Sequence, residues 1–282
     1  MDLLSLLWLF FILASLQPAV ARQALLVQRR HALNDLSKER GATVITLIHR
    51  QETMSLLGFP LVRYIDIDDA ESVLRAIRET PSGRPIEIIL HTPGGMVIAA
   101  QQIASALADH DAQVTGVVPH YAMSGGTLIA LGCDEIVVES HAALGPIDPQ
   151  VGQYPAASFV EVARMPGERD DHTLIMADVG RKAIAQVEGF TARLLERRVT
   201  PEHAQELAHV LAGGTWTHDH PLQPAELRAL GLPVRVGVGD GERRLMTLYP
   251  QPRGRTPAVE YVPGPERPGL PPGRRAPVAS KG

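Results

Sequence analysis

Apolar positions follow two patterns along the chain, and the two patterns alternate. Short runs of consecutive β-branched and aliphatic residues are typical of strands that are buried on both faces of a sheet. Longer stretches with apolar residues at helical spacing are typical of helices that cover such a sheet. Because strands alternate with helices, we expect an α/β fold with a parallel sheet and right-handed crossovers. The predicted strands are residues 43–49, 85–91, 114–119 and 136–139, and the predicted helices are residues 68–79, 97–108, 124–131, 172–198, 201–212 and 224–230.

The N-terminal segment differs from the rest of the chain. Residues 3–16 are almost unbroken apolar sequence, and the apolar character continues weakly through residues 19–21. The Ala19-Val20-Ala21 triplet resembles a cleavage site, which favours a secretory signal and a secreted or periplasmic protein. However, no positive charge precedes the run, and Arg22 follows it, which favours an uncleaved single-pass anchor with a cytoplasmic domain. Both interpretations assign residues 1–21 to membrane targeting and not to the fold.

Composition defines the remaining organisation. The chain has 282 residues, of which 45% are apolar and 21% charged, so a sizeable core is expected. We expect a charged, helix-compatible connector at residues 22–42, one domain at residues 43–249, and a disordered Pro/Arg-rich tail at residues 250–282. A net charge of −4 and only 4% aromatic residues argue against a nucleic-acid partner. The single cysteine, Cys133, excludes an internal disulfide and a cysteine-based zinc site.

Two glycine-bearing turns are the strongest chemical signal. Residues 91–95 read His-Thr-Pro-Gly-Gly and residues 122–126 read Ala-Met-Ser-Gly-Gly, and each segment joins a predicted strand to a predicted helix. The hydroxyl of Ser124 can point out of such a turn, where the N–H groups of a helix start can hold a developing oxyanion. The turns lie about thirty residues apart, the length of one βαβ unit. They therefore predict one site built from two units, although the glycines could also serve only tight helix–sheet packing.

A nucleophilic serine needs a base. Lys182 is the one lysine of the predicted domain, because Lys38 lies in the connector and Lys281 in the tail. A lysine can act as a base when burial lowers its pKa, whereas arginine cannot. The alternative interpretation is that Lys182 is a solvated surface residue.

Three motifs occur together in this chain: Pro-Gly-Gly at residues 93–95, Tyr-Ala-Met-Ser-Gly-Gly at residues 121–126 and Leu-Gly-Pro-Ile-Asp-Pro-Gln at residues 144–150. Together they resemble the Clp/crotonase-fold serine peptidases, and in particular the serine dehydrogenase proteinase (SDH) family, which is related to signal peptide peptidase A. The resemblance covers about residues 43–234 and implies a parallel sheet of repeated ββα units with flanking helices, behind an N-terminal transmembrane helix. It also implies assembly into a homo-oligomer.

The resemblance implies a role for several residues. Ser124 matches the nucleophile, and the N–H groups of Gly95 and Gly125 match the oxyanion hole. Soluble Clp proteases place a histidine base after the serine helix, but Gly145 stands at that position here, and His141 is out of phase.

The Ser–Lys arrangement of the membrane-associated relatives therefore fits better, with Lys182 as the base. Gly94 and Asp148 are candidates for a substrate groove. The segment at residues 216–221, Trp-Thr-His-Asp-His-Pro, contains adjacent potential ligands, but such a run seldom closes a tetrahedral metal site, and we expect a structural turn.

These observations predict a membrane-anchored serine endopeptidase that cleaves peptide or protein substrates without a metal or cofactor. One alternative is a crotonase-type acyl-CoA enzyme, in which the two N–H groups would polarise a thioester. Another is a non-catalytic membrane scaffold with a decayed protease site.

Overall fold

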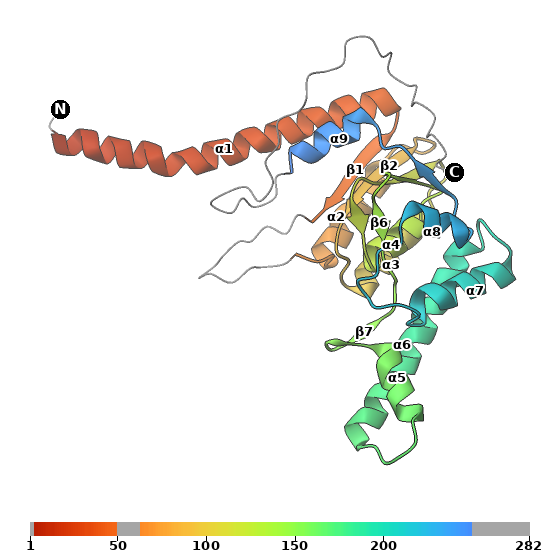
Figure 1. Cartoon of the computed structure of the whole chain (residues 1–282). Coiled ribbons are helices and arrows are strands. Elements are labelled where there is room, and N and C mark those ends of the chain that lie inside the picture. Colours follow the sequence, from red (N-terminus) through yellow and green to blue (C-terminus); the bar gives the residue numbers. More distant parts are fainter. Residues whose placement is uncertain (1–2, 50–62, 250–282) are drawn as a thin grey trace, which may run out of the picture. The chain divides into compact units, whose positions relative to one another are not determined.

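The computed structural model describes the backbone of residues 3–49 and 63–249 and, within these ranges, the side chains of residue 17 and of residues 19 onward (Figure 1). The expected tail at residues 250–282 lies outside the described residues. The elements in chain order are α1 (Leu3–Arg40), β1 (Thr43–Ile48), α2 (Ile67–Glu79), β2 (Ile86–His91), α3 (Val97–Ala108), β3 (Val114–Val118), β4 (Tyr121–Ala122), α4 (Gly125–Leu131), β5 (Glu135–Val138), β6 (Ala143–Leu144), β7 (Gln150–Val151), β8 (Tyr154–Pro155), α5 (Ala156–Arg164), α6 (Asp171–Leu195), α7 (Pro201–Ala212), α8 (Pro224–Ala229), β9 (Val234–Val236) and α9 (Asp240–Thr247).

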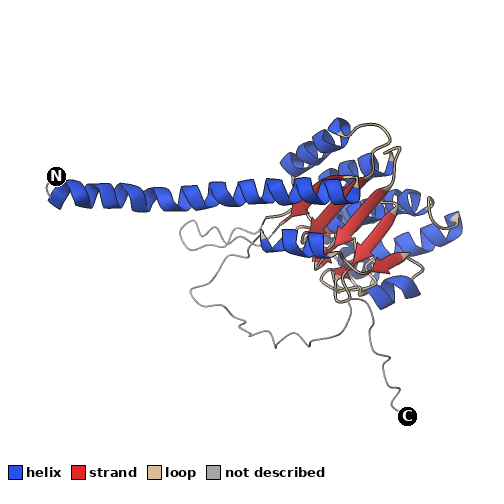
Figure 2. Ribbon diagram, turned by 90° about the horizontal axis from the view of Figure 1, so that it is seen from above, coloured by secondary structure: helices blue, strands red, loops and turns tan. Residues whose placement is uncertain are grey.

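The centre of the domain is a five-stranded parallel sheet with the strand order β1-β2-β3-β5-β9 (Figure 2). All six residues of β2 are buried, because helices cover both faces of the sheet. The predicted parallel α/β sheet is therefore confirmed, and β9 adds a fifth strand that the sequence pattern did not predict. The segment β3–β4–α4 has the expected ββα order, and β4 pairs in parallel with β6 outside the main sheet.

Successive residues of β2 enter two separate apolar clusters. Ile88 and Leu90 belong to the large core that also contains buried residues of α2, α3, α4, α6 and α7. Ile89 points to the opposite face, where it belongs to a smaller cluster with Leu36 of α1 and Leu245 of α9. The end of α1 and all of α9 therefore cover one face of the sheet, and helices α2, α3, α4, α6 and α7 contribute to the core on the other.

Helix α1 runs without a break through the expected connector. Its last turns belong to the folded domain, because Leu36 is buried, Arg29 Nε donates to the carbonyl oxygen of Leu248 at 2.7 Å, and Arg40 pairs with Glu242 of α9. A search of the described residues for a helix of sufficient length and apolar character to span a membrane finds no candidate.

The segment after β6 differs from the expected long loop. It contains the antiparallel pair β7–β8 and then α5, which the apolar pattern did not predict. Helices α5 and α6 together form an arm that extends away from the sheet (Figure 1), and α6 then packs against α7. The arm's outer surface retains exposed apolar side chains, including Met165, Leu174, Ile175 and Val179.

Candidate functional site

The structure brings the two glycine turns together at the carboxyl ends of the strands. Thr92 and Ala122 form a parallel bridge, and the N–H of Met123 donates to the carbonyl oxygen of Thr92 at 2.9 Å. Gly94 has φ +102°, and a Cβ atom placed on it would lie 2.8 Å from Ser124 Cβ. Only a residue without a side chain fits this contact, so the glycine allows the first turn to reach the serine.

Ser124 lies on a strained turn. Its φ of 51° makes it the one non-glycine residue with positive φ in the described part of the chain, and such a conformation costs about 1–3 kcal/mol. Ser124 is the N-cap of α4, yet its side chain makes no capping hydrogen bond. The hydroxyl is therefore not committed to the helix, and strain of this kind is typical of functional positions.

Two backbone N–H groups next to Ser124 have no acceptor among the described residues. One belongs to Gly125, the first residue of α4, and the other to Gly95. A Cβ atom on Gly125 would lie 3.5 Å from the nitrogen of Gly95, so the two groups are neighbours. The N–H of Gly94, by contrast, donates to Thr92 Oγ1 at 3.1 Å. Gly95 and Gly125 are thus the two donors that can hold an oxyanion here.

A buried carboxylate and a histidine meet on the two segments that pair at Leu144 and Leu222. Asp148 is only 1% exposed, and its Oδ1 lies 2.7 Å from Nδ1 of His218. Its Oδ2 accepts a hydrogen bond from Gln150 Nε2 at 2.8 Å. An imidazole that donates from Nδ1 to a carboxylate has its lone pair on Nε2, which is the form that a general base requires. Nε2 of His218 makes no hydrogen bond within the described chain.

Strand pairing explains why these residues lie at the same end of the fold as Ser124. Leu144 pairs with Leu222 in an antiparallel bridge. Asp148 lies four residues after Leu144, and His218 lies four residues before Leu222. Because the two segments run in opposite directions, both residues lie on the same side of the bridge. Ala122 pairs in parallel with Leu144, so Ser124 and the segment leading to Asp148 leave the sheet in the same direction. From the sequence, Asp148 is predicted only as a groove residue, and His218 falls in a predicted structural turn. The signal that would find the pair is the long-range bridge, which local patterns do not show.

Lys182 lies on the exposed side of α6. Its side chain is 70% exposed, and Nζ donates to Asp178 Oδ2 at 2.6 Å, one helical turn earlier. The hydrogen bond from Lys182 is the main cause that lowers the pKa of Asp178. No hydrogen bond joins Lys182 to Ser124 in the described part of the single chain. Lys182 therefore has the environment of the surface-lysine alternative, and its role as a base stays a prediction.

Gly145 and the turn at residues 216–221 have structural roles beside the site. A Cβ atom on Gly145 would overlap the side chain of Met123, so no histidine can replace this glycine without rearrangement. The ring of His220 stacks on Trp216 with a centroid distance of 5.3 Å, which orders the turn that bears His218. The described residues contain no group of three or more acidic, histidine or cysteine side chains with the arrangement of a metal site.

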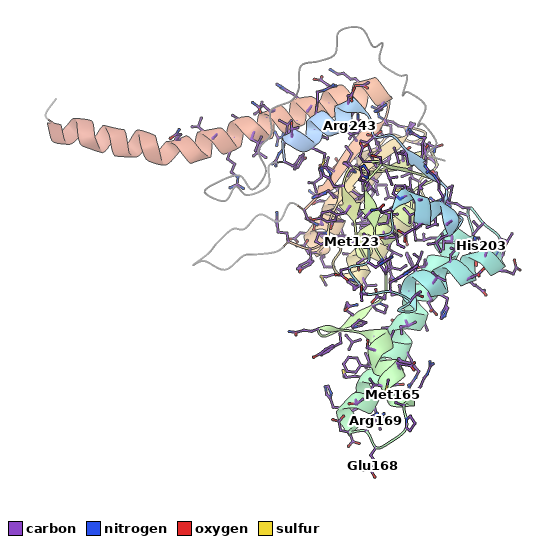
Figure 3. The ribbon with its side chains drawn as sticks, in the orientation of Figure 1. Met123, Met165, Glu168, Arg169, His203 and Arg243 are labelled. Carbon is purple, nitrogen blue, oxygen red and sulfur yellow. The ribbon has the colours of Figure 1, made fainter. Side chains whose placement is uncertain are left out.

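A cavity of about 510 Å³ adjoins the site. Val97, two residues after Gly95, Gln150, two residues after Asp148, and Phe190 of α6 all line it. Asp148 itself is buried and does not line this cavity. Figure 3 shows Met123, the neighbour of Ser124, in the body of the domain, away from Met165 near the tip of the α5–α6 arm.

The fold and the turn at Ser124 place the chain among α/β proteins that have a strained serine turn between a strand and a helix, beside two N–H groups without acceptors. The chain belongs to the family of ClpP-like SDH-type serine proteinases, whose model matches residues 1–270. It is similar to two uncharacterized proteins of Methanocaldococcus jannaschii. MJ1495 is 46% identical over 259 residues, which are 92% of this chain and 89% of that protein, and MJ0137 is 47% identical over 260 residues, which are 92% and 91%.

Solved structures match more distantly. A mutant of the 1510-N membrane-bound stomatin-specific protease aligns with a TM-score of 0.46 at 19% identity, over 71% of this chain and 81% of that one. A mutant of ClpP1 from Listeria monocytogenes aligns with a TM-score of 0.46 at 15% identity, over 73% and 98%.

Proposed function

We propose that this protein is a serine endopeptidase in which Ser124 attacks the peptide carbonyl. The observation that carries the proposal is the strained turn at Ser124, whose hydroxyl is uncommitted and lies beside two N–H groups without acceptors. Membership in a serine proteinase family supports the same reaction. An acyl-CoA enzyme of the crotonase type would use the same two N–H groups but would not need a serine at the turn.

We assign the role of general base to His218, oriented by Asp148. The bond from His218 Nδ1 to the buried carboxylate selects the tautomer with a lone pair on Nε2, and Asp148 can stabilise the imidazolium that forms after proton transfer. Lys182 is the alternative base. Its side chain is 70% exposed and already donates to Asp178, so it lacks the burial that a lysine base requires.

The reaction then proceeds in two halves. Ser124 Oγ forms a bond to the peptide carbonyl carbon while His218 Nε2 takes the hydroxyl proton, and the carbonyl oxygen becomes an oxyanion bound by the N–H groups of Gly95 and Gly125. The C–N bond breaks as His218 returns the proton to the leaving amine. Water hydrolyses the resulting acyl-enzyme by the same steps, with His218 again as the base.

The context of the enzyme is a further part of the proposal. The apolar run at residues 3–16 supports attachment to a membrane as a single-pass anchor, with the domain in the cytoplasm, and cleavage after residue 21 is the alternative. The exposed apolar side chains of the α5–α6 arm, such as Leu174 and Ile175, support assembly into a homo-oligomer.

The test compares four purified variants for cleavage of a fluorogenic peptide library and for labelling by a fluorophosphonate probe. Ser124→Ala should abolish both activities, and His218→Gln should lower cleavage by about 10³- to 10⁶-fold. Lys182→Met should stay near wild type, as should His203→Gln, a control for histidine loss at an exposed helix position.

Each outcome has a separate meaning. Loss of cleavage in Lys182→Met with full activity in His218→Gln would establish the Ser–Lys arrangement instead. Full activity in Ser124→Ala would refute the peptidase proposal. In that case, saturable binding of an acyl-CoA thioester would support the crotonase-type alternative, and its absence would support the scaffold.

A further inference from the structure

A second histidine–aspartate pair lies behind the oxyanion-binding turn, on the other side from His218. His49, at the end of β1, is buried, and its Nε2 lies 3.1 Å from Asp69 Oδ2 in the first turn of α2. Its Nδ1 lies 2.9 Å from Oγ1 of Thr92, which is completely buried. Thr92 Oγ1 in turn accepts the N–H of Gly94 at 3.1 Å.

These contacts form one continuous chain of hydrogen bonds. With a neutral imidazole, His49 donates from Nε2 to Asp69 and accepts the Thr92 hydroxyl proton at Nδ1, which leaves the Thr92 oxygen as the acceptor for Gly94. Both ring nitrogens of His49 are therefore occupied, and the ring has no nitrogen left to serve Ser124. Partial burial raises the pKa of Asp69, but hydrogen bonds from His49 and from the N–H of Asp66 outweigh burial, and the net pKa lies below its usual range. The chain thus ends on an ionised carboxylate.

We propose that His49, Asp69 and Thr92 form a positioning relay that determines the orientation of the oxyanion-binding peptide. The inference rests on the proposed function of Ser124. The chain commits the N–H of Gly94 to Thr92, which holds the Gly94 peptide in one orientation and leaves the next N–H, that of Gly95, directed at the site. None of the three side chains is assigned a contact with substrate.

Backbone contacts with Ile65 connect the Gly94–Gly95 turn to the helix that bears Asp69, so the position of the turn depends on the relay. The carbonyl oxygen of Gly94 accepts the N–H of Ile65 at 2.8 Å, and Met96 donates back to Ile65 at 2.8 Å. A side chain at Gly95 would overlap the backbone of Ile65. Because Ile65 immediately precedes Asp66, the N-cap of α2, the same short segment connects the Gly94–Gly95 turn to Asp69. Loss of the relay should therefore misalign the Gly95 donor without unfolding the domain.

The relay predicts a defect confined to the reaction step. Thr92→Val removes the hydroxyl but retains the shape, and Thr92→Ser retains the hydroxyl. We expect Thr92→Val to lower kcat by about 10- to 100-fold, below the cost of deleting a whole oxyanion donor. KM should change by about two-fold at most, because KM reports ground-state contacts. Thr92→Ser should rescue kcat to near the wild-type value.

A second pair of variants covers the case in which Thr92→Val does not fold. Asp69→Ala removes the hydrogen-bond partner of His49 at a partly exposed position. It should lower kcat by about 3- to 10-fold, which is less than the loss expected for Thr92→Val or for deletion of a whole oxyanion donor. Asp66→Ala is its matched control, because Asp66 caps the same helix through the N–H of Asp69 but does not touch His49.

The experiment uses the full chain, a fluorogenic peptide and a peptide aldehyde, whose tetrahedral adduct places an oxygen in the hole. Support requires that the aldehyde affinity and kcat fall together in Thr92→Val or Asp69→Ala, but not in Thr92→Ser or Asp66→Ala. Wild-type kcat and aldehyde affinity in Thr92→Val and Asp69→Ala, with Ser124→Ala inactive, would overturn the relay alone. Cleavage by Ser124→Ala would overturn the relay and the proposed function together.

Discussion

Replacement of Glu87 by glutamine should stabilise the protein at alkaline pH and leave its stability nearly unchanged at acidic pH. Glu87 lies on β2 and lines a cavity of about 410 Å³ together with Glu242 of α9 and Arg40 of α1. Burial is the main cause that raises the pKa of Glu87, to about 7, and the negative charge of Glu242 adds to it. Arg40 acts in the opposite direction but pairs more closely with Glu242 than with Glu87, from which it lies 3.6 Å away.

The magnitude follows from the difference between the folded and unfolded states. The pKa of a glutamate in the unfolded chain is about 4.5, so the folded state binds more protons between pH 4.5 and 7. The free energy of unfolding therefore falls as pH rises through this window. The difference between 4.5 and about 7, at about 1.36 kcal/mol per pH unit, gives a penalty on the order of 3 kcal/mol above pH 7. Glutamine cannot ionise and escapes this penalty.

The measurement is urea-induced unfolding of wild type and Glu87→Gln at pH 5 and pH 8, with Glu79→Gln as the control at an exposed helix position. The advantage of Glu87→Gln over wild type should be below about 1 kcal/mol at pH 5 and should approach about 3 kcal/mol at pH 8. The control should follow wild type at both values. An equal difference at the two pH values, or a wild type more stable than Glu87→Gln at pH 8, would refute the reasoning.

Two further predictions concern the fold around the site. Gly94→Ala should abolish cleavage and should destabilise the protein by about 1–3 kcal/mol more than Gly83→Ala. Both glycines have positive φ, but only a Cβ at Gly94 would meet Ser124. Equal losses of stability for the two variants in chemical denaturation would contradict this reason. Ile103→Ala should lower the free energy of unfolding by about 2–5 kcal/mol, because Ile103 is fully buried, whereas Ile175→Ala should change it by less than about 0.5 kcal/mol; a large loss at Ile175 in the same assay would indicate that a second copy covers it.

Local patterns predicted most of the sheet but not its last strand or the helix that follows. The runs that became β1, β2, β3 and β5 are apolar at consecutive positions because both faces are covered. β9 has only three residues, of which Val234 alone is buried, so it has too little pattern to be recognised. Helix α9 is short and mostly polar, and it is held by its contact with α1, a long-range feature.

The candidate site likewise has a part that local sequence predicts and a part that depends on long-range contacts. The two glycine turns were predictable because their chemistry is local: a strand end, a glycine that permits an unusual φ, and a helix start. The partner of the serine was not predictable in this way. Gly145 stands where the family resemblance implies a histidine base, and Lys182 is the base that the sequence then favours. His218 lies 94 positions beyond Ser124, and only the bridge between Leu144 and Leu222 brings its segment beside Asp148.

The two histidine–aspartate pairs show why contacts, and not residue types, determine the assignment of roles. His49 and His218 each lie beside a carboxylate at hydrogen-bonding distance. In His49 the second nitrogen is already bonded to Thr92, so a proton taken from a serine would break an existing hydrogen bond in a buried site. In His218 the second nitrogen has no partner among the described residues, and the ring is one-third exposed, so substrate can reach it. The same pair of residue types therefore supports alignment of the turn at His49 and proton transfer at His218. Substitution of His49 should reduce kcat, whereas substitution of His218 should abolish it almost completely.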